Sequence, residues 1–156
     1  MARYAVGNNQ AGTQQNLTTT YKTQVSVTAA TAGPVTRGTV LDISFGASGP
    51  PNSTDCDIYY SLDRTTGTLG TGTSATPSPI DNLSSACATV GTVCFTAEPG
   101  TFGANLYAIP LNQRSSLRVF FDQGFHWPAI NTTGIAGRAD SPTYTSTVGY
   151  FMLFDE

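Results

Sequence analysis

Apolar and polar residues alternate with a period of two in short stretches along most of this chain. The clearest case is residues 38–47, GTVLDISFGA, where Leu41, Ile43 and Phe45 share one face of an extended segment. No window repeats apolar residues at the helical spacing, and clusters of Gly, Pro, Asn or Ser interrupt the chain at short intervals. The pattern therefore predicts an all-β fold.

Eight runs follow the strand pattern strongly enough to be placed. They cover residues 21–29, 38–47, 56–63, 92–98, 104–111, 115–122, 134–139 and 147–156. Strands of this number, with short spacing and turn residues between them, predict a single-domain antiparallel β-sandwich. The alternation is compatible with a jelly roll and with an immunoglobulin-like sandwich, and does not choose between them.

Two segments lie outside this pattern. Residues 1–20 are rich in Gly, Asn, Gln and Thr and show no periodicity, which predicts an extended N-terminal arm ahead of a sandwich domain over 21–156. Residues 64–85, RTTGTLGTGTSATPSPIDNLSS, are too long for a hairpin turn. We expect them to form a long surface loop and a candidate contact region.

The last predicted strand is apolar on both faces. Tyr150, Met152 and Phe154 alternate with Phe151 and Leu153. A strand of this kind either lies in the centre of a sheet or turns one face toward another subunit. The second alternative makes Tyr150, Met152 and Phe154 candidates for a subunit interface and favours a trimer.

The only histidine and the only tryptophan are neighbours in the stretch FHWPAI. Adjacent residues in extended backbone point to opposite faces, so Trp127 and His126 are expected on opposite sides of a strand. This favours Trp127 as a buried residue or a subunit-interface anchor, and His126 as a surface residue. The alternative is that both rings stack on a sugar.

Composition and charge exclude several classes of function. Of the 156 residues only 11% are charged, the net charge is −3, and Lys22 is the single lysine. A nucleic-acid-binding protein needs a basic stripe, which is absent, so no nucleic-acid partner is predicted. No apolar stretch approaches the length of a membrane span, so no membrane association is predicted either.

The residues that carry most chemistry are few and scattered. Cys56, Cys87 and Cys94 lack metal-ligand spacing, and they are either reduced, buried thiols or include a disulfide between Cys87 and Cys94. The carboxylates form no recognisable acid pair, and His126 has no sequence-adjacent partner. We therefore predict neither catalytic residues, nor a metal site, nor a cofactor.

Three longer segments resemble a known family. MARYAVGNNQAGTQQNLTTTYKT, TAEPGTFGANLYAIPLNQRSSLRVF and GRADSPTYTSTVGYFMLFDE are similar to small proteins of tailed bacteriophages, which are abundant among phages of aquatic bacteria. Some proteins of this kind resemble head decoration, or cement, proteins. The similarity covers most of the chain, while residues 64–85 and the stretch DQGFHW depart from it.

The resemblance implies a structural virion protein, made in the host bacterial cytoplasm and bound to the outer surface of the capsid. Its partner would be the phage major capsid protein, and it would act as a homotrimer. If the arm contacts the capsid by adding a strand, Arg3, Tyr4 and Lys22 are candidate contact residues. The alternative function is a receptor- or glycan-binding module of a phage head or tail fibre, with its site on residues 64–85 and Trp127.

Overall fold

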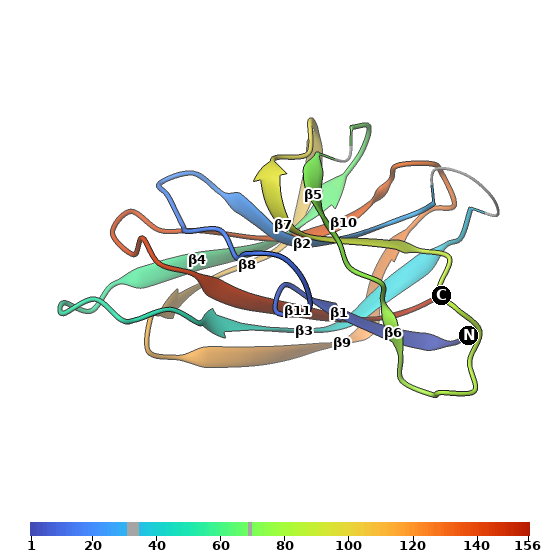
Figure 1. Cartoon of the computed structure of the whole chain (residues 1–156), viewed down its shortest axis with the longest axis horizontal. Helices are drawn as coiled ribbons and strands as arrows, with labels where there is room; N and C mark the ends of the chain where they lie inside the picture. The colour runs from blue at the N-terminus through green and yellow to red at the C-terminus, as the bar shows by residue number, and fades with distance from the viewer. Residues whose placement is uncertain (31–34, 69) are drawn as a thin grey trace.

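The computed structural model describes residues 1–30, 35–68 and 70–156, and these contain strands but no helix. The strands pack as two antiparallel sheets, one above the other (Figure 1). Their bounds are β1 (Arg3–Gly7), β2 (Lys22–Thr28), β3 (Gly38–Ala47), β4 (Asp57–Thr65), β5 (Thr71–Ser74), β6 (Ser78–Pro79), β7 (Val90–Ala97), β8 (Phe102–Asn112), β9 (Ser116–Trp127), β10 (Gly134–Asp140) and β11 (Val148–Asp155).

The strand order identifies the sandwich as a jelly roll. One sheet has five strands in the order β6-β1-β11-β3-β9, and the other has six in the order β5-β7-β2-β10-β4-β8. When β5, β6 and β7 are set aside and the other eight are numbered along the chain, the orders become 1-8-3-6 and 2-7-4-5. This is the jelly-roll arrangement, so the predicted β-sandwich is confirmed and the immunoglobulin-like alternative is excluded.

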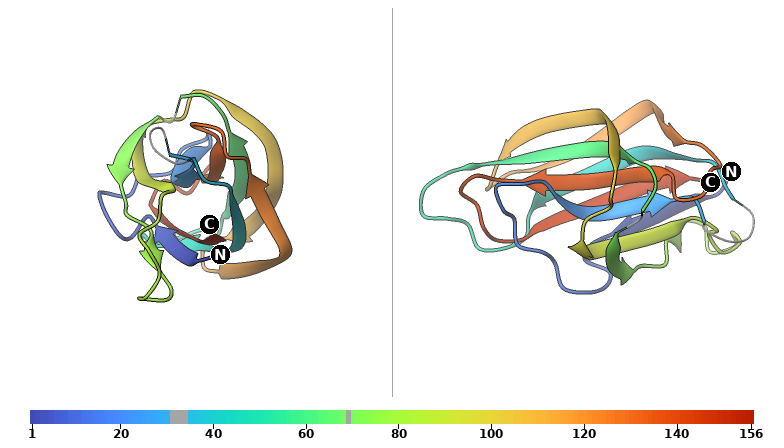
Figure 2. Two further views of the ribbon diagram at one scale, coloured as in Figure 1. Left: turned by 90° about the vertical axis from the view of Figure 1, so that its right-hand side faces the viewer. Right: turned by 90° about the horizontal axis from the view of Figure 1, so that it is seen from above.

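The predicted N-terminal arm is wrong. Residues 3–7 form β1, which lies inside the five-stranded sheet between β6 and β11. Tyr4 and Val6 are buried on its inner face, and the backbones of Ala2 and Glu156 exchange two hydrogen bonds. The two termini consequently lie close together (Figure 2). This short segment becomes a strand because Tyr4 and Val6 alternate toward the core and β11 offers it a complete ladder of partners.

The polar residues after β1 are also part of the folded domain. The buried Asn8 side chain donates hydrogen bonds to the Gln24 side chain (3.2 Å) and the Val148 carbonyl (2.8 Å), and it accepts one from the Tyr150 amide (2.9 Å). Leu17, further along, is buried. A buried amide with these partners joins the two sheets, since Gln24 lies in β2 and Tyr150 in β11.

The predicted loop over residues 64–85 is only partly correct. Residues 64 and 65 complete β4, residues 71–74 form β5, residues 78–79 form β6, and residue 69 lies outside the described residues. Strand β6 extends the five-stranded sheet beyond β1, while β7 and β5 extend the six-stranded sheet beyond β2. The insertion between β4 and β8 thus closes one side of the sandwich, and its longest fully exposed run is residues 78–83.

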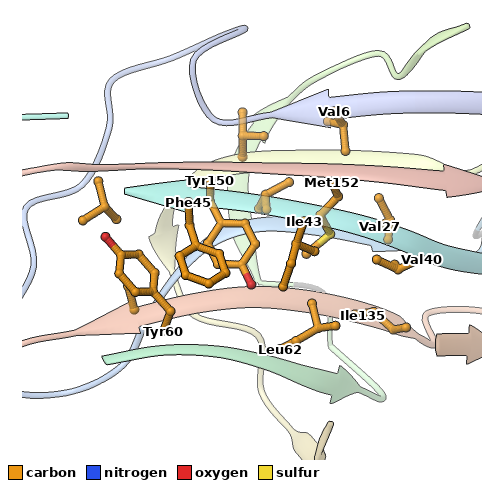
Figure 3. Close-up of a cluster of buried hydrophobic side chains, with 14 of the residues drawn as sticks. Val6, Val27, Val40, Ile43, Phe45, Tyr60, Leu62, Ile135, Tyr150 and Met152 are labelled. Atoms are coloured by element: carbon orange, nitrogen blue, oxygen red, sulfur yellow. The ribbon is translucent and has the colours of Figure 1, made fainter. Parts of the chain in front are cut away.

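Aromatic side chains from both sheets meet in the core (Figure 3). Phe45 of β3 stacks on Tyr60 of β4 at 4.4 Å between ring centroids, and lies 5.5 Å from the ring of Tyr150. The Tyr150 hydroxyl donates a hydrogen bond to the Ser61 carbonyl across the sandwich (3.1 Å). A Cβ at Gly137 would lie 2.4 Å from the Tyr150 ring, so only glycine leaves room for this ring.

A bulge changes the face on which Leu41 lies. The pairing of β3 with β9 shifts between Val40 and Asp42, opposite a stretch of β9 that contains Gly124 with a φ of 64°. Val40 therefore turns into the core, fully buried, while Leu41 is only half-buried. The strict alternation expected for residues 38–47 holds from Asp42 onward and is broken before it.

Removing residues 1–7 is expected to lower the free energy of unfolding by at least about 4 kcal/mol, because Tyr4 and Val6 lose their burial and β11 loses a neighbour. Urea denaturation followed by circular dichroism measures this. The control Arg3→Ala removes only an exposed ion pair and should cost about 0–1 kcal/mol. Unchanged stability of the truncated chain would restore the interpretation of this segment as a free arm.

Candidate interaction surfaces

The residues proposed as a subunit interface lie in the core instead. Trp127, Tyr150, Met152 and Phe154 are each at most 2% exposed. The strand β11 does occupy the centre of its sheet, so the first of the two interpretations of its apolar faces is the correct one. The four residues therefore pack within one chain and are not available to a second.

Trp127 and His126 lie on opposite faces, as predicted. The Trp127 ring is fully buried, meets Phe154 edge to face at 5.7 Å, and covers Gly38 so closely that a Cβ there would lie 2.0 Å from it. His126 is exposed, and its Nδ1 shares a hydrogen bond with the Thr39 hydroxyl (2.6 Å). Because Trp127 is inaccessible, its ring cannot contribute to the alternative sugar-binding site.

The three proposed capsid contacts do not form one surface. Tyr4 is 1% exposed and its hydroxyl donates to the Ser85 carbonyl (2.9 Å), so its assignment as a contact residue is wrong. Arg3 is exposed in the five-stranded sheet, where its Nε pairs with Asp155 at 3.1 Å. Lys22 is half-buried at the start of β2 in the other sheet.

Of the two alternatives for the cysteines, the structure has free thiols and no disulfide between Cys87 and Cys94. All three cysteines are free. The Cys94 thiol donates to the backbone carbonyls of Asn8 (3.4 Å) and Ala11 (3.2 Å), whereas the Cys87 thiol donates to Glu156 (3.2 Å). Burial raises the pKa of Cys87 to about 12, so this thiol stays protonated at neutral pH.

The side chain of Glu156 is hydrogen-bonded to the residues just before β7. Its carboxylate accepts hydrogen bonds from the amides of Ala88 (2.8 Å) and Thr89 (2.7 Å) as well as from Cys87. Burial by itself raises the pKa of this carboxyl, but the hydrogen bonds from Thr89, Ala88 and Cys87 bring it below its ordinary value. The charged form is thus the one that the fold stabilises.

Arginines neutralise several of the carboxylates. In the described residues, three ion pairs connect neighbouring strands of one sheet and one connects two loops: Arg3–Asp155, Arg118–Asp42, Arg138–Asp63 and, between loops, Arg114–Asp55. Arg138 also lies over the Phe102 ring, with its guanidinium carbon 3.6 Å from the ring centroid. Within residues 1–30, 35–68 and 70–156, no three His, Cys, Asp or Glu side chains come together to hold a metal ion.

The most distinctive surface is a shallow groove on the outer face of the five-stranded sheet, which we call the outer groove. One part, about 540 Å³, is lined by Arg3, Ser44, Ile80, Arg118, Phe151 and Leu153. A second part, about 490 Å³, shares Ser44, Arg118 and Phe151 and continues over the glycine-rich ends of β3 and β11. The groove therefore crosses all of β1, β11, β3 and β9.

The floor of the outer groove is apolar and its rim carries guanidinium groups. Ile80 and Phe151 are 59% and 37% exposed, although they are large hydrophobic residues. The Arg118 side chain is 73% exposed, while its partner Asp42 is only 1% exposed. The hydrogen bond to Asp42 raises the pKa of Arg118, and the carboxylate lies beneath the guanidinium, so the solvent meets the positive group.

The sequence pattern identified β11 as a strand of the interaction surface but predicted the opposite face of that strand. It noted that the last strand is apolar on both sides, but assigned the interface to the side that is buried. The accessible side carries Phe151 and Leu153. No sequence pattern near Ile80 or Arg118 indicated that they belong to the groove. They reach this face through the pairing of β6 with β1 and of β9 with β3.

No helix in the described residues is long and apolar enough to cross a membrane. No known protein-family model matches the chain, and searches of curated proteins and of solved structures found no match. The outer groove and the edges of the two sheets are therefore interpreted from their own chemistry.

Replacing Trp127 by alanine is expected to lower the free energy of unfolding by about 3–5 kcal/mol, because it empties a fully buried site. The neighbouring change His126→Ala removes an exposed ring and should cost less than about 1 kcal/mol. Thermal or urea unfolding followed by circular dichroism suits both variants, since it needs no tryptophan signal. Similar losses for the two would show that the strand does not separate their environments.

The stability of the chain should fall as the pH is lowered through the titration of Glu156. Because the folded state holds its pKa below the ordinary value of 4.5, the contribution is present above that pH and is lost as the pH falls through the folded pKa. Urea unfolding at a series of pH values from neutral to acid measures the slope. Glu156→Gln should flatten the slope in this window, and an unchanged slope would contradict the role of the carboxylate.

Proposed function

We propose that this chain is a structural protein of a phage particle, which binds the outer surface of the major capsid protein lattice and stabilises the head. The contact is made through the outer groove. The observation that carries the proposal is that Ile80 and Phe151 are exposed in the same groove as two accessible guanidinium groups, Arg3 and Arg118.

The chemistry of the outer groove suits a polypeptide partner. An apolar surface rimmed by polar groups is typical of a protein interaction site, and arginine is enriched in such interfaces. The groove is shallow and elongated across four strands, so an extended segment fits it better than a small molecule does. The preferred segment has an apolar side chain for the floor and acidic groups for Arg3 and Arg118.

The fold and the resemblance support the same class of function. Jelly rolls recur in viral capsid proteins and in lectins, although a fold alone does not assign a function. The resemblance to phage decoration proteins favours the first of these. A receptor- or glycan-binding role stays a prediction without a site, since Trp127 is buried.

The mode of binding differs from the one that the sequence indicated. An arm that orders on contact would lose conformational entropy when it binds. Here residues 3–7 already belong to the sheet, so the capsid would meet a preformed surface at a smaller entropic cost. The trimer that the resemblance implies stays a prediction, because the residues on which it rested are buried within one chain.

The direct test is quantitative mass spectrometry of purified particles of the source phage, which measures the copies of this chain per copy of the major capsid protein. A ratio near one, or a simple fraction of one, is expected for a capsid-wide layer. A handful of copies would place the chain in the tail or at a vertex. Its absence from particles would overturn the proposal.

The change Ile80→Asp is expected to weaken binding to capsids that lack this protein by at least ~10-fold, because it places a carboxylate on the apolar floor. The control Leu83→Asp introduces the same charge at a leucine that is 90% exposed in the same segment but outside the groove. Co-sedimentation with capsids measures both. Equal binding of the two variants would exclude the outer groove as the contact.

A further inference from the structure

The four edge strands of the sandwich are protected to different degrees. The edge strands β5 and β6 have only 4 and 2 residues, and the second contains Pro79. The edge strand β8 has 11 residues but is interrupted by Pro110, which has no amide hydrogen to offer a further strand. Among these described edges, β9 alone is both long, with 12 residues, and free of proline.

A long edge strand without proline is a template for another strand. In β9 the regular pairing with β3 covers residues 116–120, and residues 121–124 form the bulge opposite Leu41. Figure 1 shows β9 at the margin of the sandwich, outside β3. In the described part of the chain, β3 is the only strand that pairs with it. Its exposure alternates from Ser116 to Asp122, with the exposed positions on the outer face of the sheet. The edge is therefore accessible in the first part of β9, from Ser116 to Asp122.

The side chains at the centre of this edge are self-complementary. Phe120 is 67% exposed, and it is flanked on the same face by Arg118 and Asp122. In an antiparallel pair of β9 with a second β9, a two-fold axis at Phe120 sets Arg118 of each copy opposite Asp122 of the other. The two Phe120 rings then meet on the axis, while Val119 and Phe121 face each other on the inner side.

We propose that two copies of this chain associate edge to edge through β9, in antiparallel register centred on Phe120. The product is a two-fold symmetric dimer in which the five-stranded sheets join as one continuous ten-stranded sheet. The occupant of this edge is thus a second copy of the same chain, paired over residues 117–123.

Neighbouring registers lack this complementarity. If the two-fold axis lies at Val119 instead of Phe120, Arg118 of one copy is opposite Phe120 of the other, and Asp122 is opposite Ser116. If the axis lies at Phe121, Phe120 of one copy is opposite Asp122 of the other. Both leave the charges without a partner across the axis, and opposite charges and aromatic pairs are what stabilise cross-strand positions.

Arg118 can serve both contacts. Its Nε and Nη2 point to the same oxygen of Asp42, with the Nε at 2.7 Å, which leaves further N–H donors of the guanidinium for the second copy's carboxylate. Asp42 thereby holds the guanidinium in place on the strand. The ion pair across the axis is formed by a side chain whose position is already restricted in one copy.

Sedimentation velocity over a range of concentrations tests the dimer on the purified full chain. A concentration-dependent dimer is expected for the unmodified protein. Phe120→Lys and Asp122→Arg should each raise the dimer dissociation constant by at least ~10-fold, the second by setting arginines opposite each other. Asp81→Arg makes the same change of charge in an exposed segment on the other side of the sandwich and should leave the dimer intact.

Cysteine crosslinking tests the register. Phe120→Cys places two thiols on the two-fold axis, whereas Ser116→Cys places them four residues away on either side, roughly 26 Å apart along the strands. A short bis-maleimide should therefore join Phe120→Cys into dimers and leave Ser116→Cys as separate chains. As a control, the unmodified protein is treated with the same reagent, which shows whether the three native thiols react.

Several results would overturn the proposal. A protein that stays monomeric at all concentrations has no such edge pairing. A trimer, or a dimer that Phe120→Lys and Asp122→Arg leave unchanged, would place the contact elsewhere. Equal crosslinking at positions 116 and 120 would exclude the register centred on Phe120. Circular dichroism of each variant confirms that a lost dimer does not reflect a lost fold.

Discussion

The hydrogen bond from the Tyr150 hydroxyl to the Ser61 carbonyl joins the two sheets through the middle of the core, and the arrangement of the sandwich depends on it. Burial raises the pKa of Tyr150 well above its ordinary value, so the hydroxyl stays a neutral donor. The ring needs the space that Gly137 leaves on β10, and it packs beside Phe45 and Tyr60. Tyr150 thereby contributes to the spacing of the sheets, alongside the stacked Phe45 and Tyr60 rings and the buried Asn8 amide.

The insertion between β4 and β8 gives the sandwich two unlike sides. On one side it adds β6 to one sheet and β7 and β5 to the other, so that short strands protect both edges. On the opposite side β8 and β9 stay as the edges, and only β8 carries a proline. The same insertion brings Ile80 to the outer groove. A single segment thus closes one side of the sandwich and supplies an apolar residue to the outer groove.

The two proposals concern one sheet and reinforce each other physically. The outer groove and the β9 edge belong to the five-stranded sheet, and they share Arg118. A two-fold axis perpendicular to a continuous sheet keeps the outer faces of both copies on one side. A dimer would then present two grooves to the same surface, and simultaneous binding at both would strengthen attachment to a repeating lattice without any new contact.

The sequence by itself determined the eight strands with clear alternation and, in residues 38–47, the shared face of Ile43 and Phe45, which the structure buries. A period of two is a local property, so it survives whatever the strands pair with. Only the tertiary structure decided the rest. The short segments β1, β5 and β6 form strands because β11, β7 and β1 supply their hydrogen-bonding partners. For β11, with apolar residues on both faces, alternation separates the two faces without saying which one is buried. Packing against the second sheet made that choice, and it left Phe151 and Leu153 outside because only one face of a sheet can meet the other layer.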